Sequence, residues 1–196
     1  AIINIKDFLS QKLRSNELSY KKKIILSVGR LTKQKNFKYL INELNNFLKV
    51  NKNYILIILG DGEEKKELKN LINKLNLNEK VFLLGFKENP LSYMLRADVF
   101  VLSSIWEEVG FVIVEAALSN LLVVSSDCPN GPKEFLSSGK AGFLFENNKI
   151  NALKNTFLSL NDNNNQKKIL AKKNSLIYTR FRHYLVLKKL LSFNNS

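Results

Sequence analysis

Two glutamates eight positions apart are the side chains in this sequence whose type and spacing first suggest chemistry. Glu107 follows an apolar run at residues 99–102, and Glu115 follows a second apolar run at residues 111–114. The first run is short and rich in β-branched and aromatic residues, which predicts a buried strand, whereas residues 111–117 predict the beginning of a helix. A turn from a strand into a helix is therefore predicted at residues 103–117, S-S-I-W-E-E-V-G-F-V-I-V-E-A-A. Glu107 would lie in the loop, and Glu115 about one turn into the helix.

The helix predicted to begin near Phe111 would present unpaired main-chain N–H groups and the positive end of its dipole. Both features attract an anion such as a phosphate. Carboxylates in direct contact with a phosphate would repel it, so Glu107 and Glu115 make more sense as acceptors for sugar hydroxyls beside the phosphate. This stretch therefore leads to the hypothesis of a nucleotide-sugar site.

The segments on either side of this stretch alternate between apolar runs and amphipathic stretches. Asn36 is expected to cap the helix that follows the first run. Continuous apolar strands that alternate with helices are typical of a parallel sheet covered on both faces. The predicted fold is α/β, a doubly wound, Rossmann-like parallel sheet with C-terminal helices. The predicted strands are residues 24–28, 54–59, 81–84, 98–102, 121–124 and 142–145.

The loops after these strands are expected to meet at one edge of the sheet. In open parallel sheets, ligands bind beyond the carboxyl ends of the strands. One ligand could therefore be enclosed by the loops at residues 29–35, 60–62, 85–89, 103–110 and 125–132.

Composition places the chain among ordinary globular proteins. It has 196 residues, of which 45% are hydrophobic and 24% are charged, which is enough for one sizeable domain with a core. The single cysteine, Cys128, excludes an internal disulfide framework and is interpreted as a packing thiol of a reducing compartment. No apolar run approaches the roughly 20 residues of a membrane span, and no secretory signal pattern is present, so a cytoplasmic location is expected.

The formal net charge of +14 is open to three interpretations. It can reflect a general bias of composition, contact with an anionic membrane surface, or binding to nucleic acid. The lysines are spread along the chain without interleaved aromatic residues, so nucleic acid is not an expected partner. The basic, amphipathic tail at residues 177–191 could cross to a second domain or lie on the inner face of the cytoplasmic membrane.

Six motifs in a fixed order resemble a known family. They are G-R-L-x-x-x-K, G-D-G, L-G-F, A-D-V-F-V-L-S-S, the pair Glu107 and Glu115 with seven residues between them, and S-D-C-P-x-G-P-K-E-F-L. Together they resemble the C-terminal, donor-binding half of the retaining glycosyltransferases of family 4, which have the two-domain GT-B fold. The resemblance covers about residues 24–147. The last motif is similar to that of hexosyl- and N-acetylhexosaminyltransferases of bacterial surface glycans.

The resemblance implies a role for each matching residue. Arg30 and Lys35 are implied to bind the donor diphosphate, which agrees with the complementarity of guanidinium and ammonium groups to phosphate. Glu115 is implied to bind the ribose hydroxyls, and Glu107 to lie near the transferred sugar as the catalytic candidate. The further implied donor-binding positions are Gly85 and Phe86 near the base, and the main-chain N–H groups of Gly110, Phe111 and Val112.

The sequence departs from the family pattern in two places. Glu108 stands where glycine usually follows the first glutamate, and Val109 where phenylalanine usually precedes the second glycine. The sugar that fits is therefore left open.

The resemblance also implies the reaction and its partners. A nucleoside-diphosphate sugar, with UDP the expected nucleotide, would donate a hexose or N-acetylhexosamine to a surface glycan or lipid-linked acceptor, without a metal or other cofactor. We expect a linker at residues 1–23, a donor-binding domain at 24–160 and a helical tail at 161–196. The N-terminal acceptor-binding domain of the family is expected to lie outside this sequence, which would make the chain a fragment, a subunit with a separately encoded partner, or a truncated relic.

Two other function classes remain as alternatives. The first is a non-catalytic nucleotide-sugar-binding subunit or truncated paralogue. The second is a basic, Rossmann-like nucleic-acid binder. His183, the single histidine, lies in the predicted tail without partners for metal or triad chemistry and is interpreted as structural.

Overall fold

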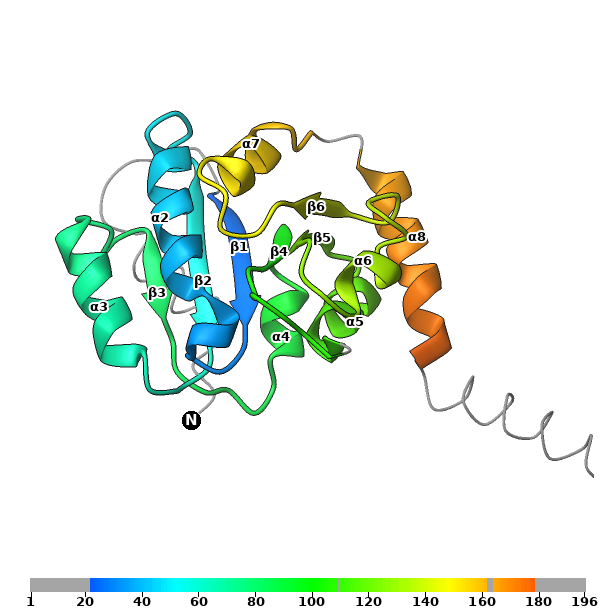
Figure 1. Ribbon diagram of the computed structural model, residues 1–196, viewed down its shortest axis with the longest axis horizontal. Helices are drawn as coiled ribbons and strands as arrows, with labels where there is room; N and C mark the ends of the chain where they lie inside the picture. The colour runs from blue at the N-terminus through cyan, green and yellow to red at the C-terminus, as the bar shows by residue number, and fades with distance from the viewer. Residues whose placement is uncertain (1–21, 109, 162–163, 179–196) are drawn as a thin grey trace, which may run out of the picture.

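The computed structural model of this chain describes residues 22–108, 110–161 and 164–178. Within them, six strands form one sheet in the order β3-β2-β1-β4-β5-β6, and all five neighbouring pairs are parallel (Figure 1). This is the doubly wound order, so the predicted Rossmann-like α/β fold is confirmed. The strands are β1 (Lys23–Val28), β2 (Tyr54–Leu59), β3 (Val81–Leu83), β4 (Val99–Leu102), β5 (Leu122–Ser126) and β6 (Phe143–Phe145).

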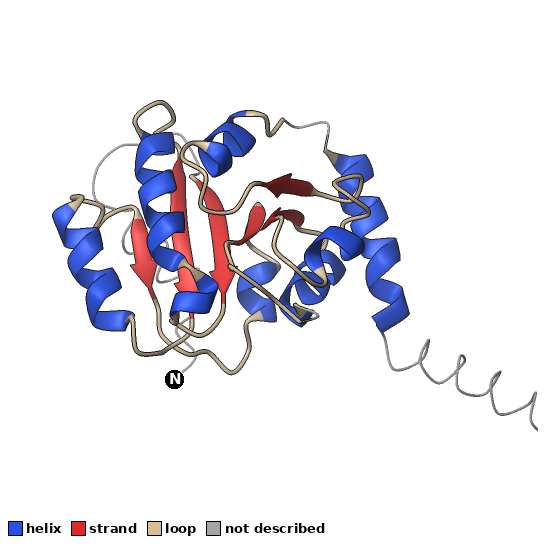
Figure 2. Cartoon of the chain, in the orientation of Figure 1, coloured by secondary structure: helices blue, strands red, loops and turns tan. Residues whose placement is uncertain are grey.

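Helices cover both faces of the sheet (Figure 2). Successive side chains of a strand point to opposite faces, so Ile25 of β1 packs with α2, α3 and α7, while its neighbour Leu26 packs with the other helices. Both side chains are fully buried. The helical elements are η1 (Lys33–Lys35), α2 (Phe37–Leu48), α3 (Lys65–Lys74), α4 (Leu91–Met94), α5 (Phe111–Leu118), α6 (Pro132–Phe135), α7 (Ala152–Leu158), α8 (Asn165–Ser175) and η2 (Leu176–Tyr178).

The beginning of α2 corrects one prediction. Asn36 precedes the helix in a left-handed conformation, with φ 54°, and its side chain makes no capping hydrogen bond. Its Nδ2 atom instead donates to Oδ1 of Asn148, at 2.7 Å, in the loop after β6. The single 3-10 turn of η1 places Asn36 in this conformation, so its amide ties two distant loops together rather than capping α2.

The glycines after β2 allow two loops to stack. Gly60 has φ +142°, and a Cβ atom there would lie 1.9 Å from the carbonyl oxygen of Gly29. The main-chain N–H of Leu31 donates to the carbonyl oxygen of Asp61 at 2.9 Å. The Gly-Asp-Gly loop thus packs directly against the loop that follows β1 and is hydrogen-bonded to it.

The last described helices pack onto this sheet. The carboxylate of Glu43 in α2, which is 3% exposed, accepts from the main-chain N–H groups of Asn151 and Lys154 at the beginning of α7. Helix α8 packs against α5 and buries Ala171 completely. The predicted domain boundaries at residues 23 and 160 stay predictions.

Some predictions fall outside the described residues, namely His183, Val109 and most of the basic tail. In the part of the chain that the structure describes, no helix is long and apolar enough to cross a membrane.

Candidate functional site

A cleft of about 550 Å³ opens at the carboxyl edge of the sheet, between the loops that follow β1 and β4. These two strands are neighbours in the sheet, and the chain connections change direction between them. Such a switch point is where open α/β sheets bind ligands. The lining residues are Val28, Gly29, Arg30, Gln34 and Lys35 from the first loop, and Trp106, Glu107, Glu108, Gly110, Phe111, Val112 and Glu115 from the second loop and α5.

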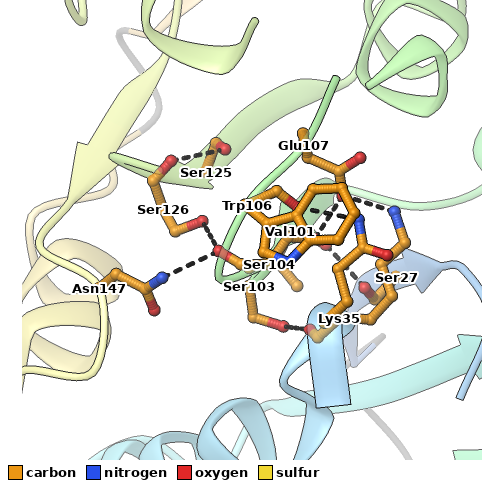
Figure 3. Close-up of polar contacts among 11 residues, drawn as sticks. Ser27, Lys35, Val101, Ser103, Ser104, Trp106, Glu107, Ser125, Ser126 and Asn147 are labelled. Carbon is orange, nitrogen blue, oxygen red and sulfur yellow. Dashed lines mark hydrogen bonds and ion pairs between the residues drawn. The ribbon is translucent and has the colours of Figure 1, made fainter. Parts of the chain in front are cut away.

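Glu107 sits at the inner end of this lining with its carboxylate fixed. The residue is 5% exposed. Its Oε1 atom accepts from Nζ of Lys35 and from Oγ of Ser104, each at 2.5 Å (Figure 3). The other oxygen, Oε2, has no hydrogen-bond partner among the described residues and is free to accept one from a ligand.

Lys35 reaches Glu107 along a channel that glycine leaves open. A Cβ atom at Gly29 would lie 3.2 Å from both Cδ and Cε of Lys35. The carbonyl oxygen of Lys35 accepts from Oγ of Ser103 at 2.7 Å, so both ends of the residue are tied to the loop after β4. Lys35, which the resemblance implies binds the donor diphosphate, thus pairs with Glu107.

Ser104 is held in turn by Ser126, the last residue of β5, and by Asn147 in the loop after β6. Its carbonyl oxygen accepts from Oγ of Ser126 at 2.6 Å and from Nδ2 of Asn147 at 3.1 Å. Figure 3 shows this chain of contacts running from Asn147 and Ser126 through Ser104 to Glu107. The orientation of the Glu107 carboxylate is therefore set by four segments of the chain.

Gly110 creates the turn into α5. It has φ +63°, in the left-handed region, and the helix begins directly after it at Phe111. The first N–H groups of a helix have no acceptor within the helix, so those of Phe111 and Val112 are available to a ligand in the cleft, whereas that of Ile113 donates to the carbonyl oxygen of Gly110 at 2.9 Å. Gly110, Phe111 and Val112, which were predicted to contribute main-chain N–H groups to the donor site, all line the cleft.

Arg30 and Glu115 stand at more open positions of the same cleft. The Arg30 side chain is exposed and forms no ion pair with any described residue. Glu115 is exposed on α5, yet partial burial of its carboxyl group raises its pKa above the ordinary value. A free guanidinium and an unpaired carboxylate at one cleft can bind a phosphate and a hydroxyl group, respectively.

Gly85 and Phe86 do not line this cleft. They lie in the loop after β3, where the carbonyl oxygen of Gly85 accepts from the N–H of Gly60 at 2.9 Å. Phe86 is 73% exposed, so it is not a core aromatic residue. Their predicted contact with the base stays a prediction.

Sequence reasoning gave no role to Gln34, Trp106 or Glu108, which also line the cleft. Trp106 and Glu108 flank Glu107, so adjacency to that glutamate was the signal that could have identified them. Gln34 lies one residue before Lys35, and its contacts to the loop after β4 are not visible in the sequence.

Cys128 is not among the residues that line the cleft. Cys128 is buried, and its burial raises the pKa of its thiol. Among the residues that the structure describes, no cluster of three or more histidine, cysteine, aspartate or glutamate side chains could hold a metal ion. The predicted metal independence stays a prediction.

Fold and cleft together define a Rossmann-like α/β domain with a ligand-sized site at the switch point of its sheet. Residues 10–176 match the family described as glycosyl transferases group 1, and the chain belongs to this family. One relative is N-acetylgalactosamine-N,N'-diacetylbacillosaminyl-diphospho-undecaprenol 4-alpha-N-acetylgalactosaminyltransferase of Campylobacter jejuni. The two sequences are 38% identical over 137 residues, which make up 70% of this chain and 37% of the relative.

Solved glycosyltransferase structures of GT-B type share the fold. A variant of TarM from Staphylococcus aureus, crystallised with UDP among its ligands, superposes with a TM-score of 0.76 at 27% identity, over 93% of this chain and 37% of that one. HepE from Anabaena in complex with UDP-glucose superposes with a TM-score of 0.72 at 26% identity, over 90% of this chain and 48% of that one. The chain thus spans between about a third and a half of the length of these relatives.

Proposed function

We propose that this chain is the donor-binding half of a retaining glycosyltransferase of family 4. It binds a UDP-linked hexose or N-acetylhexosamine, and the whole enzyme transfers that sugar to a surface glycan or lipid-linked acceptor. The acceptor-binding domain is supplied elsewhere, on the same polypeptide or by a separate subunit, which agrees with the chain spanning between about a third and a half of the length of its relatives. In this proposal no metal takes part, and the diphosphate is held by the guanidinium of Arg30 and the main-chain N–H groups at the beginning of α5.

The observation that carries this proposal is that one cleft contains both a guanidinium without an ion-pair partner and carboxylate oxygens without a hydrogen-bond partner among the described residues. Arg30 has no ion-pair partner among the described residues and lines the same cleft as the beginning of α5, and the two features together suit a diphosphate. We assign Glu115, one turn into α5, to the ribose hydroxyls. We assign Glu107, whose Oε2 atom has no partner among the described residues, to the transferred sugar.

The relatives support the choice of donor and acceptor. TarM was crystallised with UDP and HepE with UDP-glucose, and both exceed 25% identity to this chain. The Campylobacter relative acts on a diphospho-undecaprenol-linked sugar, which is a lipid-linked acceptor. A peripheral location on the cytoplasmic membrane fits such an acceptor.

Titration calorimetry tests the binding step. We expect UDP and UDP-sugars to bind. We expect Arg30→Ala to lower the affinity for UDP at least about tenfold, because a charge-assisted contact is lost. Arg96→Ala is the matched control, because Arg96 is exposed just before β4, at the opposite edge of the sheet. Absence of UDP binding, or an equal loss in both variants, would refute the proposal.

A transfer assay tests the catalytic step. The chain is combined with an acceptor-binding domain, and release of UDP from UDP-sugar is followed with a lipid-diphosphate sugar as acceptor. Transfer that is lost in Glu107→Gln supports the enzyme. Tight UDP-sugar binding without transfer in any combination would favour a non-catalytic binding subunit.

A further inference from the structure

Trp106 is a large aromatic side chain left partly in water at the mouth of the cleft. It is the only tryptophan among the 196 residues. Its side chain lines the cleft and the residue is 48% exposed, whereas the adjacent Glu107 is 5% exposed. Trp106 shares this cleft with Glu107 and Lys35, and all three are labelled in Figure 3. An exposed aromatic ring next to a buried carboxylate calls for an explanation, because large apolar side chains are normally packed.

The backbone that carries this ring is fixed on both sides. The carbonyl oxygen of Trp106 accepts from Nε2 of Gln34 at 3.0 Å, and the N–H of Ile105 donates to the carbonyl oxygen of Gln34 at 2.8 Å. The N–H of Glu107 donates to the carbonyl oxygen of Pro129 at 3.3 Å. Gln34 therefore clamps the segment to the loop after β1, and the ring is held at the cleft rather than carried on a loose loop.

The chemistry of the indole matches a sugar ring. Its flat apolar face can pack on the C–H face of a pyranose, and its N–H, which has no acceptor among the described residues, can donate to a hydroxyl group. Ligand pockets typically combine such an aromatic surface with a few fixed polar groups. Glu107 and Lys35 supply those polar groups beside Trp106.

We propose that Trp106 is a stacking platform for the pyranose ring of the donor sugar and discriminates a UDP-sugar from UDP. This inference rests on the proposed function, since it assigns the sugar subsite of the same cleft. Gln34 acts as its positioning residue. In this proposal the nucleotide binds at α5 and Arg30, and only the sugar contacts the indole.

The alternative to a sugar at this surface is contact with a partner domain. Ile105, the neighbouring residue, is 39% exposed but does not line the cleft, so it would belong to such an interface and not to the sugar subsite. Trp106 shares its cleft with Lys35 and Glu107, and charged groups are depleted at the centre of protein interfaces. These observations favour the sugar.

Calorimetry with UDP, UDP-glucose and UDP-N-acetylglucosamine measures this role as a ratio of affinities. We expect Trp106→Ala to lower the affinity for the better-binding UDP-sugar about tenfold and to leave the affinity for UDP unchanged within about twofold. Trp106→Phe should retain most of the affinity for the UDP-sugar. Ile105→Ala is the control and should leave both affinities unchanged. Equal losses for UDP and UDP-sugar, or none, would overturn the inference, while failure of UDP to bind the unmodified chain would instead refute the proposed function.

Intrinsic fluorescence gives a second measurement on the unmodified protein. Because the chain has one tryptophan, emission excited at about 295 nm reports on Trp106 alone. We expect a saturable change in emission with UDP-sugar that is much larger than with UDP, and weaker in Gln34→Ala. An emission spectrum that saturating UDP-sugar leaves unaltered would contradict stacking. A change that appears only on addition of an acceptor-binding domain would assign Trp106 to the interface.

Discussion

Nζ of Lys35 lies 2.5 Å from Oε1 of Glu107, so two residues separated by 72 positions form one ion pair at the inner end of the cleft. Their side chains are 15% and 7% exposed. The pair neutralises a carboxylate at a place where an anionic donor is proposed to bind. The ion pair therefore adds no net repulsive charge beside the proposed diphosphate site.

This pair predicts a strongly coupled response to mutation. Lys35→Met leaves the Glu107 carboxylate buried with Ser104 alone, and we expect a loss of about 2–4 kcal/mol in the free energy of unfolding. The double variant Lys35→Met/Glu107→Gln should recover most of that loss, because neither charge is then left unpaired. Urea denaturation measures these two variants together with the single variant Glu107→Gln. Lys33→Met, in the same turn but exposed, is the control and should change stability by less than about 0.5 kcal/mol. Additive losses in the double variant would argue against the coupling.

Glu115 predicts a dependence of stability on pH. Burial raises its pKa in the folded state above the ordinary value of 4.5, so ionisation is disfavoured on folding. This contribution to stability is fully present below 4.5 and is lost as the pH rises through the raised pKa. Glu115→Gln cannot ionise, so its melting temperature relative to the unmodified protein should rise across that window.

The same variant separates stability from binding. Glu115→Gln should lower the affinity for UDP about tenfold at pH 7.5, because a neutral amide accepts hydrogen bonds from hydroxyl groups less strongly than a carboxylate. Glu79→Gln, exposed just before β3 at the other edge of the sheet, is the control for both readouts. A more stable variant with undiminished UDP affinity would exclude Glu115 from the ribose site.

Two glycines predict contrasting effects of the same substitution. Gly60→Ala places Cβ 1.9 Å from a main-chain oxygen at φ +142°, and we expect it to cost more than about 3 kcal/mol and to leave little folded protein. Gly85→Ala meets no atom within 4 Å at φ +73°, so it should cost only the backbone strain, about 1 kcal/mol. Soluble yield and urea denaturation distinguish them. Similar costs would mean that the Gly-Asp-Gly loop does not support the loop of Arg30.

Much of the fold followed from the sequence because each strand is a short, continuous apolar run. The run at residues 54–59, for example, is buried at every position, as a central strand of a parallel sheet must be. The strand ends were less well predicted. β5 continues to Ser126, because the polar Ser125 and Ser126 are buried, and Ser126 donates to the carbonyl oxygen of Ser104.

The details of the cleft depended on contacts that no local pattern encodes. The meeting of Arg30, Glu107 and α5 at one edge followed from the topology, since β1 and β4 are adjacent. Asn147 on the carbonyl oxygen of Ser104, and Gln34 on that of Trp106, join residues 43 and 72 positions apart. An asparagine-rich sequence offers many equivalent amides, so only the tertiary structure selects these two.

A crystal structure of the chain with UDP is the most direct test of the central claim. We predict that the diphosphate lies against the main-chain N–H groups at the beginning of α5 and the guanidinium of Arg30. The ribose hydroxyls would then contact the carboxylate of Glu115, and the β-phosphate would point toward Glu107. UDP bound outside this cleft, or bound in it with the uridine at Glu107, would contradict the account.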